Sequence, residues 1–190
     1  MATQYAVEER PGAAGREQSL LIPVATTELP KLPSRPTAQC FIGPQYGLRN
    51  DHLDRWLLPY QPGTAECVVT TFRPDREATE VEWAAALLGV SVEMPAKSLM
   101  KFLKEREYTM SLIQMEDMVE RTRQGFHTGV PTDGWSGFCF VENKTGGVEL
   151  AGIYCDEGEK RWHLKFSPNR DIHWRRRHRL LVPNWNVPKL

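Results

Sequence analysis

The stretch GFCFVENKTGGVELAGIYC, residues 137–155, decides the fold. It contains two apolar segments of strand length, GFCFVEN and GVELAGIYC, on either side of the turn sequence KTGG. A short glycine-containing linker between two such segments is typical of a β-hairpin. The sequence therefore predicts a pair of antiparallel strands at this point of the chain.

Two later segments extend the predicted sheet. In KRWHLKFS, residues 160–167, apolar and polar residues alternate as they do in a strand with one buried face. DIHWRRRHRLLV, residues 171–182, is expected to be the next strand of a meander of about four strands. The β-branched segment AECVVTTF, residues 65–72, is bounded by turn residues and is expected to join the same sheet.

The segment before the hairpin has the pattern of three helices. Asp75 is predicted to cap a first helix that ends at Gly89, and Pro95 is predicted to begin a second. Ser111 and Gln114 have the spacing of a capping box at the start of a third. The sequence thus predicts an α+β fold of about three helices followed by an antiparallel β-meander of four or five strands.

Prolines divide the chain into an arm and a body. Five prolines in residues 1–38 disfavour helix, so this region is expected to be an extended or disordered arm. Its apolar piece SLLIPVA could add a strand to the body or to a neighbouring molecule. Residues 39–190 are predicted to form a single α+β domain, with its helical part in 74–125 and its sheet part in 136–187.

Composition sets limits on the class of protein. The chain has no net charge and 41% hydrophobic residues, which is ordinary for a globular protein. Its cysteines form no C-x-x-C pair and three of them lie in apolar runs, which favours free thiols in a reducing compartment. No signal peptide or membrane-spanning run is recognisable. We therefore expect an intracellular, cytoplasmic protein with no membrane partner and no cofactor.

Charge is distributed unevenly along the chain. Residues 159–190 contain nine lysine or arginine and two acidic residues, a net charge of +7, so residues 1–158 carry −7. In a strand, Arg175, Arg177 and Arg179 would project from one face at intervals of about 6.6 Å. That interval is close to the spacing of phosphates along a nucleic-acid strand, and arginine binds phosphate well.

The sequence therefore predicts a non-enzymatic nucleic-acid-binding accessory module that contacts the phosphate backbone through a basic C-terminal strand. Tryptophans near this strand could stack on bases. The predicted nucleic-acid contacts are Arg175, Arg177, Arg179, Arg176, Lys165, Arg161, Trp174 and Trp185.

Two other functions remain open. An assembly or inhibitor protein, for example a viral protein or a subunit of a larger complex, would dock an acidic protein surface with the basic strand and another partner with residues 1–38. A small metal-dependent nuclease would use Asp133 and Glu142 to hold Mg²⁺ and Lys144 near the attacking water. No phosphate-binding loop or nucleophile motif is present, so a non-enzymatic role is favoured.

Two further patterns are weaker. The segment 82–106 has the outline of a helix-turn-helix, although Pro95 occupies a position where that motif carries an apolar core residue. Four potential metal ligands fall in the predicted sheet, but they lack paired C-x-x-C spacing, so no metal site is expected. These four residues are Cys155, His163, His173 and His178.

Overall fold

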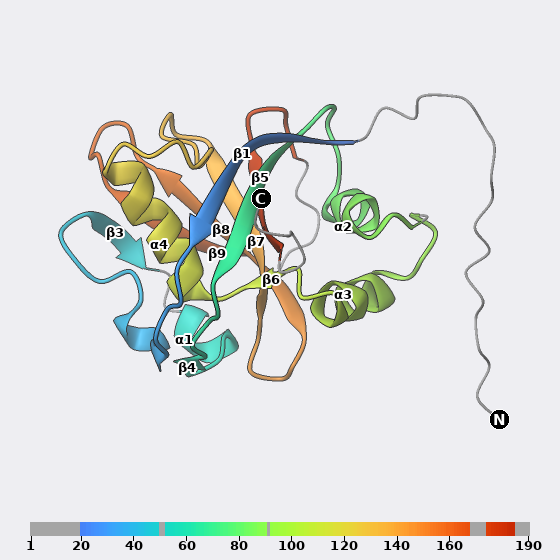
Figure 1. The fold of residues 1–190 in the computed structure, drawn as a ribbon, viewed down its shortest axis with the longest axis horizontal. Coiled ribbons are helices and arrows are strands. Elements are labelled where there is room, and N and C mark those ends of the chain that lie inside the picture. Colours follow the sequence, from blue (N-terminus) through green and yellow to red (C-terminus); the bar gives the residue numbers. More distant parts are fainter. Residues whose placement is uncertain (1–19, 50–51, 91, 168–173, 185–190) are drawn as a thin grey trace.

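The computed structural model describes residues 20–49, 52–90, 92–167 and 174–184 (Figure 1). The helices are α1 (His52–Trp56), α2 (Glu80–Leu88), α3 (Ala96–Glu105) and α4 (Leu112–Arg123), with a short 3-10 helix at Thr37–Gln39. The strands are β1 (Leu21–Leu29), β2 (Arg35–Pro36), β3 (Tyr46–Arg49), β4 (Tyr60–Gln61), β5 (Cys67–Pro74), β6 (Thr109–Met110), β7 (Ser136–Glu142), β8 (Val148–Cys155), β9 (Trp162–Ser167) and β10 (Arg179–Asn184).

The described strands form a mixed eight-stranded sheet and a separate β2–β4 pair. The order in the large sheet is β1-β5-β10-β7-β8-β9-β3, and β6 pairs with β7. The predicted hairpin is present as β7 and β8. The predicted α+β fold with an antiparallel meander is wrong, because β10 does not follow β9 in the sheet. It lies between β5 and β7 and runs parallel to β7, and β3 runs parallel to β9.

Residues 21–29 belong to the sheet and not to a separate arm. They form the edge strand β1, which is antiparallel to β5. The register shifts between Pro23 and Ala25, and such an irregularity on an edge strand accommodates a proline, which cannot donate a backbone hydrogen bond. The long arm predicted for residues 1–38 therefore does not include β1. Residues 1–19 lie outside the described part of the chain.

The central strands are buried on both faces. On β7, Phe138 and Phe140 belong to a core cluster shared with α2 and α3, whereas Cys139 and Val141 belong to one shared with α4. Figure 1 accordingly shows α4 and the α2–α3 pair on different sides of the sheet. Burial on both faces explains why the sequences of β7 and β8 are almost continuously apolar. Because the middle of each central strand is buried, polar side chains can collect only near the strand ends.

The N-terminal cap of α4 is the one predicted from the sequence, whereas the cap of α2 is a different residue. At α4, Ser111 and Gln114 form the predicted capping box, with reciprocal side-chain and backbone hydrogen bonds. At α2, the predicted cap at Asp75 is wrong. Thr79 caps this helix instead, through a capping box with Glu82. The helix therefore begins at the pattern that satisfies two backbone N–H groups at once.

The α2–α3 pair, which has the outline of a helix-turn-helix, covers one face of the sheet. The two helices contact each other, and α3 also contacts β8. Leu99 and Leu103 of α3 are fully buried in the cluster that includes Trp83 of α2. The apolar faces of both helices are therefore occupied by packing within the protein, and this packing does not require a DNA-binding role for the helix pair.

The segment predicted as a strand over 171–182 is not continuously extended. Trp174 forms an isolated antiparallel bridge with Ala78, and a turn follows at 175–178. β10 begins only at Arg179. The predicted alternation of arginine side chains along one strand is therefore wrong, because a turn lies where the extended backbone was expected.

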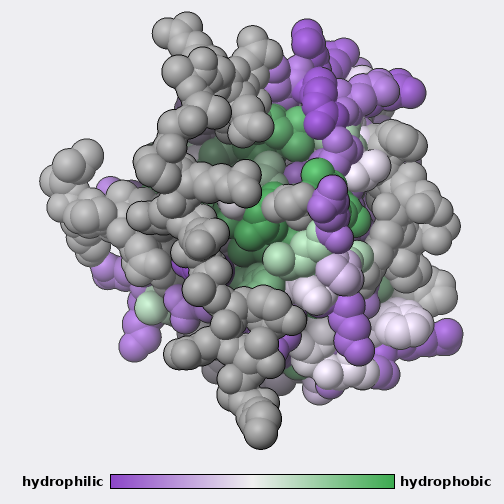
Figure 2. Space-filling view, turned by 90° about the vertical axis from the view of Figure 1, so that its right-hand side faces the viewer, coloured by the Kyte–Doolittle hydropathy of each residue, from purple (hydrophilic) through white to green (hydrophobic). Residues whose placement is uncertain are grey.

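The side of the molecule that carries α2 and α3 has hydrophobic side chains gathered near its centre, between hydrophilic ones (Figure 2). A small cavity of about 200 Å³ lies between α2 and the sheet, with Phe72, Leu87 and Val182 among its lining residues. Within the described residues, no helix has the length and apolar character that crossing a membrane requires.

Candidate functional site

An arginine-rich turn connects Trp174 to β10, and we call residues 175–178 the arginine turn. The backbone N–H of His178 donates to the carbonyl oxygen of Arg175 at 2.9 Å. In the reverse direction, the backbone N–H of Arg175 donates to Nδ1 of the His178 ring at 3.0 Å. These two hydrogen bonds join the ends of the turn and hold its backbone in one conformation.

A third side chain braces the carbonyl groups of the turn. Nη1 of Arg179 donates to the carbonyl oxygens of Arg176, Arg177 and His178, at 3.0, 2.9 and 2.9 Å. Burial lowers the pKa of Arg179 below its ordinary value. This arginine therefore stabilises the turn, with one of its terminal nitrogens engaged by the backbone.

The His178 ring lies among aromatic side chains. Its centroid is 5.1 Å from Trp135, 5.4 Å from Phe138 and 6.0 Å from Trp174, with the rings edge to face. Burial, followed by the charges of neighbouring basic side chains, lowers the pKa of His178 to about 4. The ring is therefore neutral near pH 7, which leaves Nδ1 free to accept the hydrogen bond from the turn.

The turn presents three consecutive exposed guanidinium groups, on Arg175, Arg176 and Arg177. Nη2 of Arg177 lies 2.8 Å from Oδ2 of Asp133, and its guanidinium carbon lies 5.2 Å from the centre of the Trp135 ring. Nε of Arg175 lies 3.8 Å from a carboxylate oxygen of Glu77. Both ion pairs are at the surface, where such pairs contribute little to stability and can exchange for other anions.

One of the two predicted aromatic contacts, Trp174, is not at the surface of this site. Trp174 is 0% exposed, and its ring centroid lies 4.0 Å from those of Trp83 and Phe138. It is a core residue and cannot stack on a ligand, while Trp185 lies outside the described residues. The aromatic side chain beside the turn is the partly exposed Trp135, which was not among the predicted contacts. A tryptophan in a loop just before a strand was the available signal.

The other predicted basic residues lie near the same end of the sheet. Lys165 of β9 is exposed, and its Nζ lies 4.0 Å above the centre of the Tyr154 ring. Its charge contributes to the lowered pKa of His178, so it is within electrostatic reach of the turn. Arg161 is exposed in the turn between β8 and β9, and the strand registers align this turn with the start of β7.

The residues of the predicted nuclease site do not converge. Asp133 precedes β7 and Glu142 is the last of the seven residues of this strand, which spans about 20 Å. Asp133 pairs with Arg177, whereas Glu142 pairs with Nζ of Lys104 at 2.6 Å. Lys144 is exposed in the hairpin turn. The arrangement therefore provides no pair of carboxylates that could share a metal ion.

The four potential metal ligands named from the sequence do not form a metal site among the described residues. Within these, no group of three potential ligands is arranged to hold a metal ion. His163 stacks on Tyr154 with a centroid distance of 5.0 Å, and Cys155 is buried. His173 lies outside the described residues.

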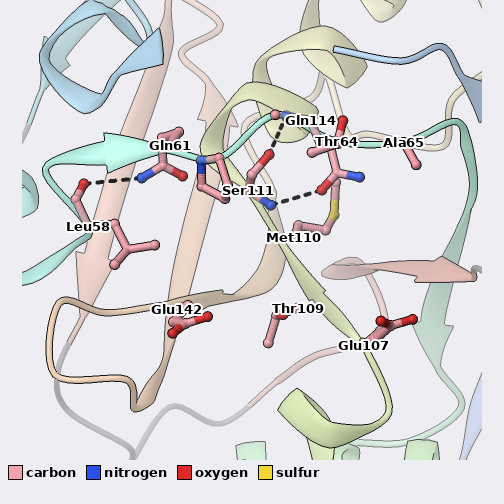
Figure 3. A pocket seen from close by; sticks show the side chains of 12 residues that line it. Leu58, Gln61, Thr64, Ala65, Glu107, Thr109, Met110, Ser111, Gln114 and Glu142 are labelled. Carbon is pink, nitrogen blue, oxygen red and sulfur yellow. Dashed lines mark hydrogen bonds between the residues drawn. The ribbon is translucent and has the colours of Figure 1, made fainter. Parts of the chain in front are cut away.

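A cavity of about 360 Å³ lies beside the start of α4 (Figure 3). Oε1 of Gln61 accepts the backbone N–H of Leu112 at 3.0 Å, and Nε2 of Gln114 donates to the sulfur of Cys67 at 3.2 Å. Glu142 also lines the cavity, but Lys104 neutralises it. The amide groups of Gln61 and Gln114 thus connect α4 to β4 and β5 and already have partners within the protein.

The arginine turn is consequently the best-supported candidate site among the described residues. No family model, curated protein or solved structure matches this chain. The function is inferred from the side chains at this surface, which combine exposed cations, an adjacent indole and a braced backbone.

Proposed function

We propose that this protein is a non-enzymatic nucleic-acid-binding module that holds the phosphate backbone on its arginine turn. The observation that carries the proposal is the position of Arg175, Arg176 and Arg177, which are consecutive and exposed on a turn closed by hydrogen bonds at both ends. Guanidinium groups bind phosphate through two parallel hydrogen bonds, more specifically than an ammonium group does.

The bracing of the turn supports this proposal energetically. Binding a ligand costs free energy when the binding segment must be ordered first, and a preorganised segment avoids that cost. Arg179 and His178 fix the backbone of the turn before any ligand arrives. Only the exposed arginine side chains then need to be ordered on binding.

The surroundings of the turn also favour an extended anion. Lys165 and Arg161 extend the positive charge along the same end of the sheet. The Trp135 ring under Arg177 offers a π-face beside the cations, a combination that is common in single-strand nucleic-acid binding. The anions already present, Asp133 and Glu77, are surface partners that a phosphate can replace.

Fluorescence anisotropy with labelled single-stranded and duplex DNA and RNA tests the proposal. Three phosphate contacts predict that affinity falls roughly twentyfold to fortyfold between about 50 and 200 mM salt. The double variant Arg175→Ala/Arg177→Ala should lose most of the binding while it remains folded, because both side chains are exposed. The matched control is Lys97→Ala/Lys101→Ala, which removes two exposed cations from α3.

The proposal is wrong if no nucleic acid binds at low salt, or if both double variants lose affinity equally. The competing proposal is an assembly protein that docks an acidic protein surface. It would be favoured by salt-sensitive binding of poly-glutamate in the absence of any nucleic-acid binding.

A further inference from the structure

A groove of about 520 Å³ lies next to the arginine turn. It is bounded by the C-terminal end of α4, by Val24 of β1 and by the loop 125–133. Asp133 and Arg179, which contact the arginine turn, also line this groove. The phosphate-binding surface and the groove are therefore parts of one continuous surface.

The loop that lines the groove is held firmly on its inner side. Oγ1 of Thr71 donates to the carbonyl oxygen of Thr128 at 2.7 Å, and the hydroxyls of Thr122 and Thr128 lie 2.5 Å apart. Gly129 has a φ of +77°, and a Cβ at this position would lie only 2.9 Å from Cβ of Ala25. This close approach permits only glycine there, so the loop lies tightly against the sheet.

The same loop exposes an aromatic ring at the groove. The side chain of Phe126 is 56% exposed, although its backbone N–H donates to the carbonyl oxygen of Arg121 at 3.0 Å. Its backbone is thus held at the end of α4 while its ring remains in contact with water. An exposed ring in a groove that Arg179 also lines is suited to stacking on the base of a nucleotide.

We infer that this groove receives an unpaired base of the nucleic acid whose phosphates lie on the arginine turn. The protein would then select single strands, with Phe126 as the stacking platform. This inference rests on the proposed function. The volume of the groove is in the range of sites for small molecules, which suits one or a few nucleotides but not a double helix. A duplex, moreover, keeps the faces of its bases stacked on one another.

Anisotropy titrations with fluorescein-labelled oligothymidine and oligouridine of about ten nucleotides test the inference, with a duplex of equal length as comparison. We expect the parent protein to prefer the single strands. Phe126→Ala should weaken single-strand binding about tenfold and leave duplex binding unchanged. Phe126→Tyr, which keeps a ring for stacking, should retain the preference.

The control is Tyr60→Ala, which removes a comparably exposed ring, 53% exposed, that does not line the groove. Circular dichroism melting of each variant establishes that it is folded. Equal binding of strands and duplex, or unchanged affinity in Phe126→Ala, overturns the inference but leaves the proposed function intact. Absence of all nucleic-acid binding, or binding of poly-glutamate alone, overturns both.

Discussion

The imidazole of His178 accepts a hydrogen bond from the backbone of Arg175, at 3.0 Å from N to Nδ1. A neutral histidine thus holds together a turn whose other side chains are cationic. Only the unprotonated ring can accept at Nδ1, so the geometry of the turn depends on the charge of this one residue. The aromatic rings around His178 favour the neutral form by excluding water.

The first prediction concerns stability at acidic pH. The pKa of His178 is about 4 in the folded protein, below its ordinary value of 6.5, because of burial and then of nearby positive charges. Between these pH values His178 is more protonated in the unfolded chain than in the folded one. The free energy of unfolding should therefore decrease as the pH falls from about 6.5 to about 4. Urea denaturation at a series of pH values measures this slope.

The comparison variant for this experiment is His178→Asn, which keeps an acceptor but does not titrate. It should be less stable than the parent and should show a flatter pH dependence in the same window. Glu116 has a pKa raised by burial, which gives a slope of the opposite sign in both proteins. The difference between parent and variant therefore isolates His178, and identical slopes would show that the ring does not stay neutral in the fold.

The second prediction concerns the start of α2. Thr79 accepts the backbone N–H of Glu82 at 3.3 Å, and Glu82 in turn accepts the backbone N–H of Thr79 at 2.7 Å. Thr79→Ala should reduce the free energy of unfolding by about 1 kcal/mol. Asp75→Ala, at the cap that the sequence suggested, should change it by less than about 0.5 kcal/mol. Chemical denaturation of both variants decides between the two helix starts, and a larger effect at Asp75 would contradict the structure.

Local signals in the sequence predicted local structure well. The β7–β8 hairpin and the capping box of Ser111 and Gln114 each depend on residues a few positions apart. The place of β10 between β5 and β7 depends on contacts between distant segments, such as Leu180 with Phe72 on one side and Phe138 on the other. Strand periodicity does not indicate which strands pair with each other. The order of the strands in the sheet could therefore not be predicted from the sequence.

The sequence prediction named the basic residues of the candidate site but placed them on a strand. A strand was the simplest backbone for this run of basic residues. The backbone forms a turn instead, because the side chains of His178 and Arg179 make hydrogen bonds to it. These bonds take the place of the hydrogen bonds of a sheet. The burial of Trp174 depends on Trp83 and Ala78, which are about a hundred residues away in sequence. The position of Trp135 beside Arg177 likewise depends on a contact between distant segments.

The third prediction concerns Asp133, whose carboxylate lies 2.8 Å from Nη2 of Arg177. In the proposed function this carboxylate competes with phosphate for the guanidinium and repels the approaching strand. Asp133→Asn should therefore raise the affinity for a labelled single strand several-fold, since an exposed ion pair contributes up to about 1 kcal/mol. The effect should shrink at high salt, which screens the repulsion.

Glu105→Gln is the matched control for Asp133→Asn. It removes the same unit of negative charge from α3, where the carboxylate pairs with Lys101 at 3.5 Å. If net charge alone governed binding, both variants would gain affinity equally. A gain confined to Asp133→Asn shows that the carboxylate competes at the arginine turn itself. A loss of affinity in Asp133→Asn would instead mean that this carboxylate orients Arg177 for the phosphate, and the competition argument would be wrong.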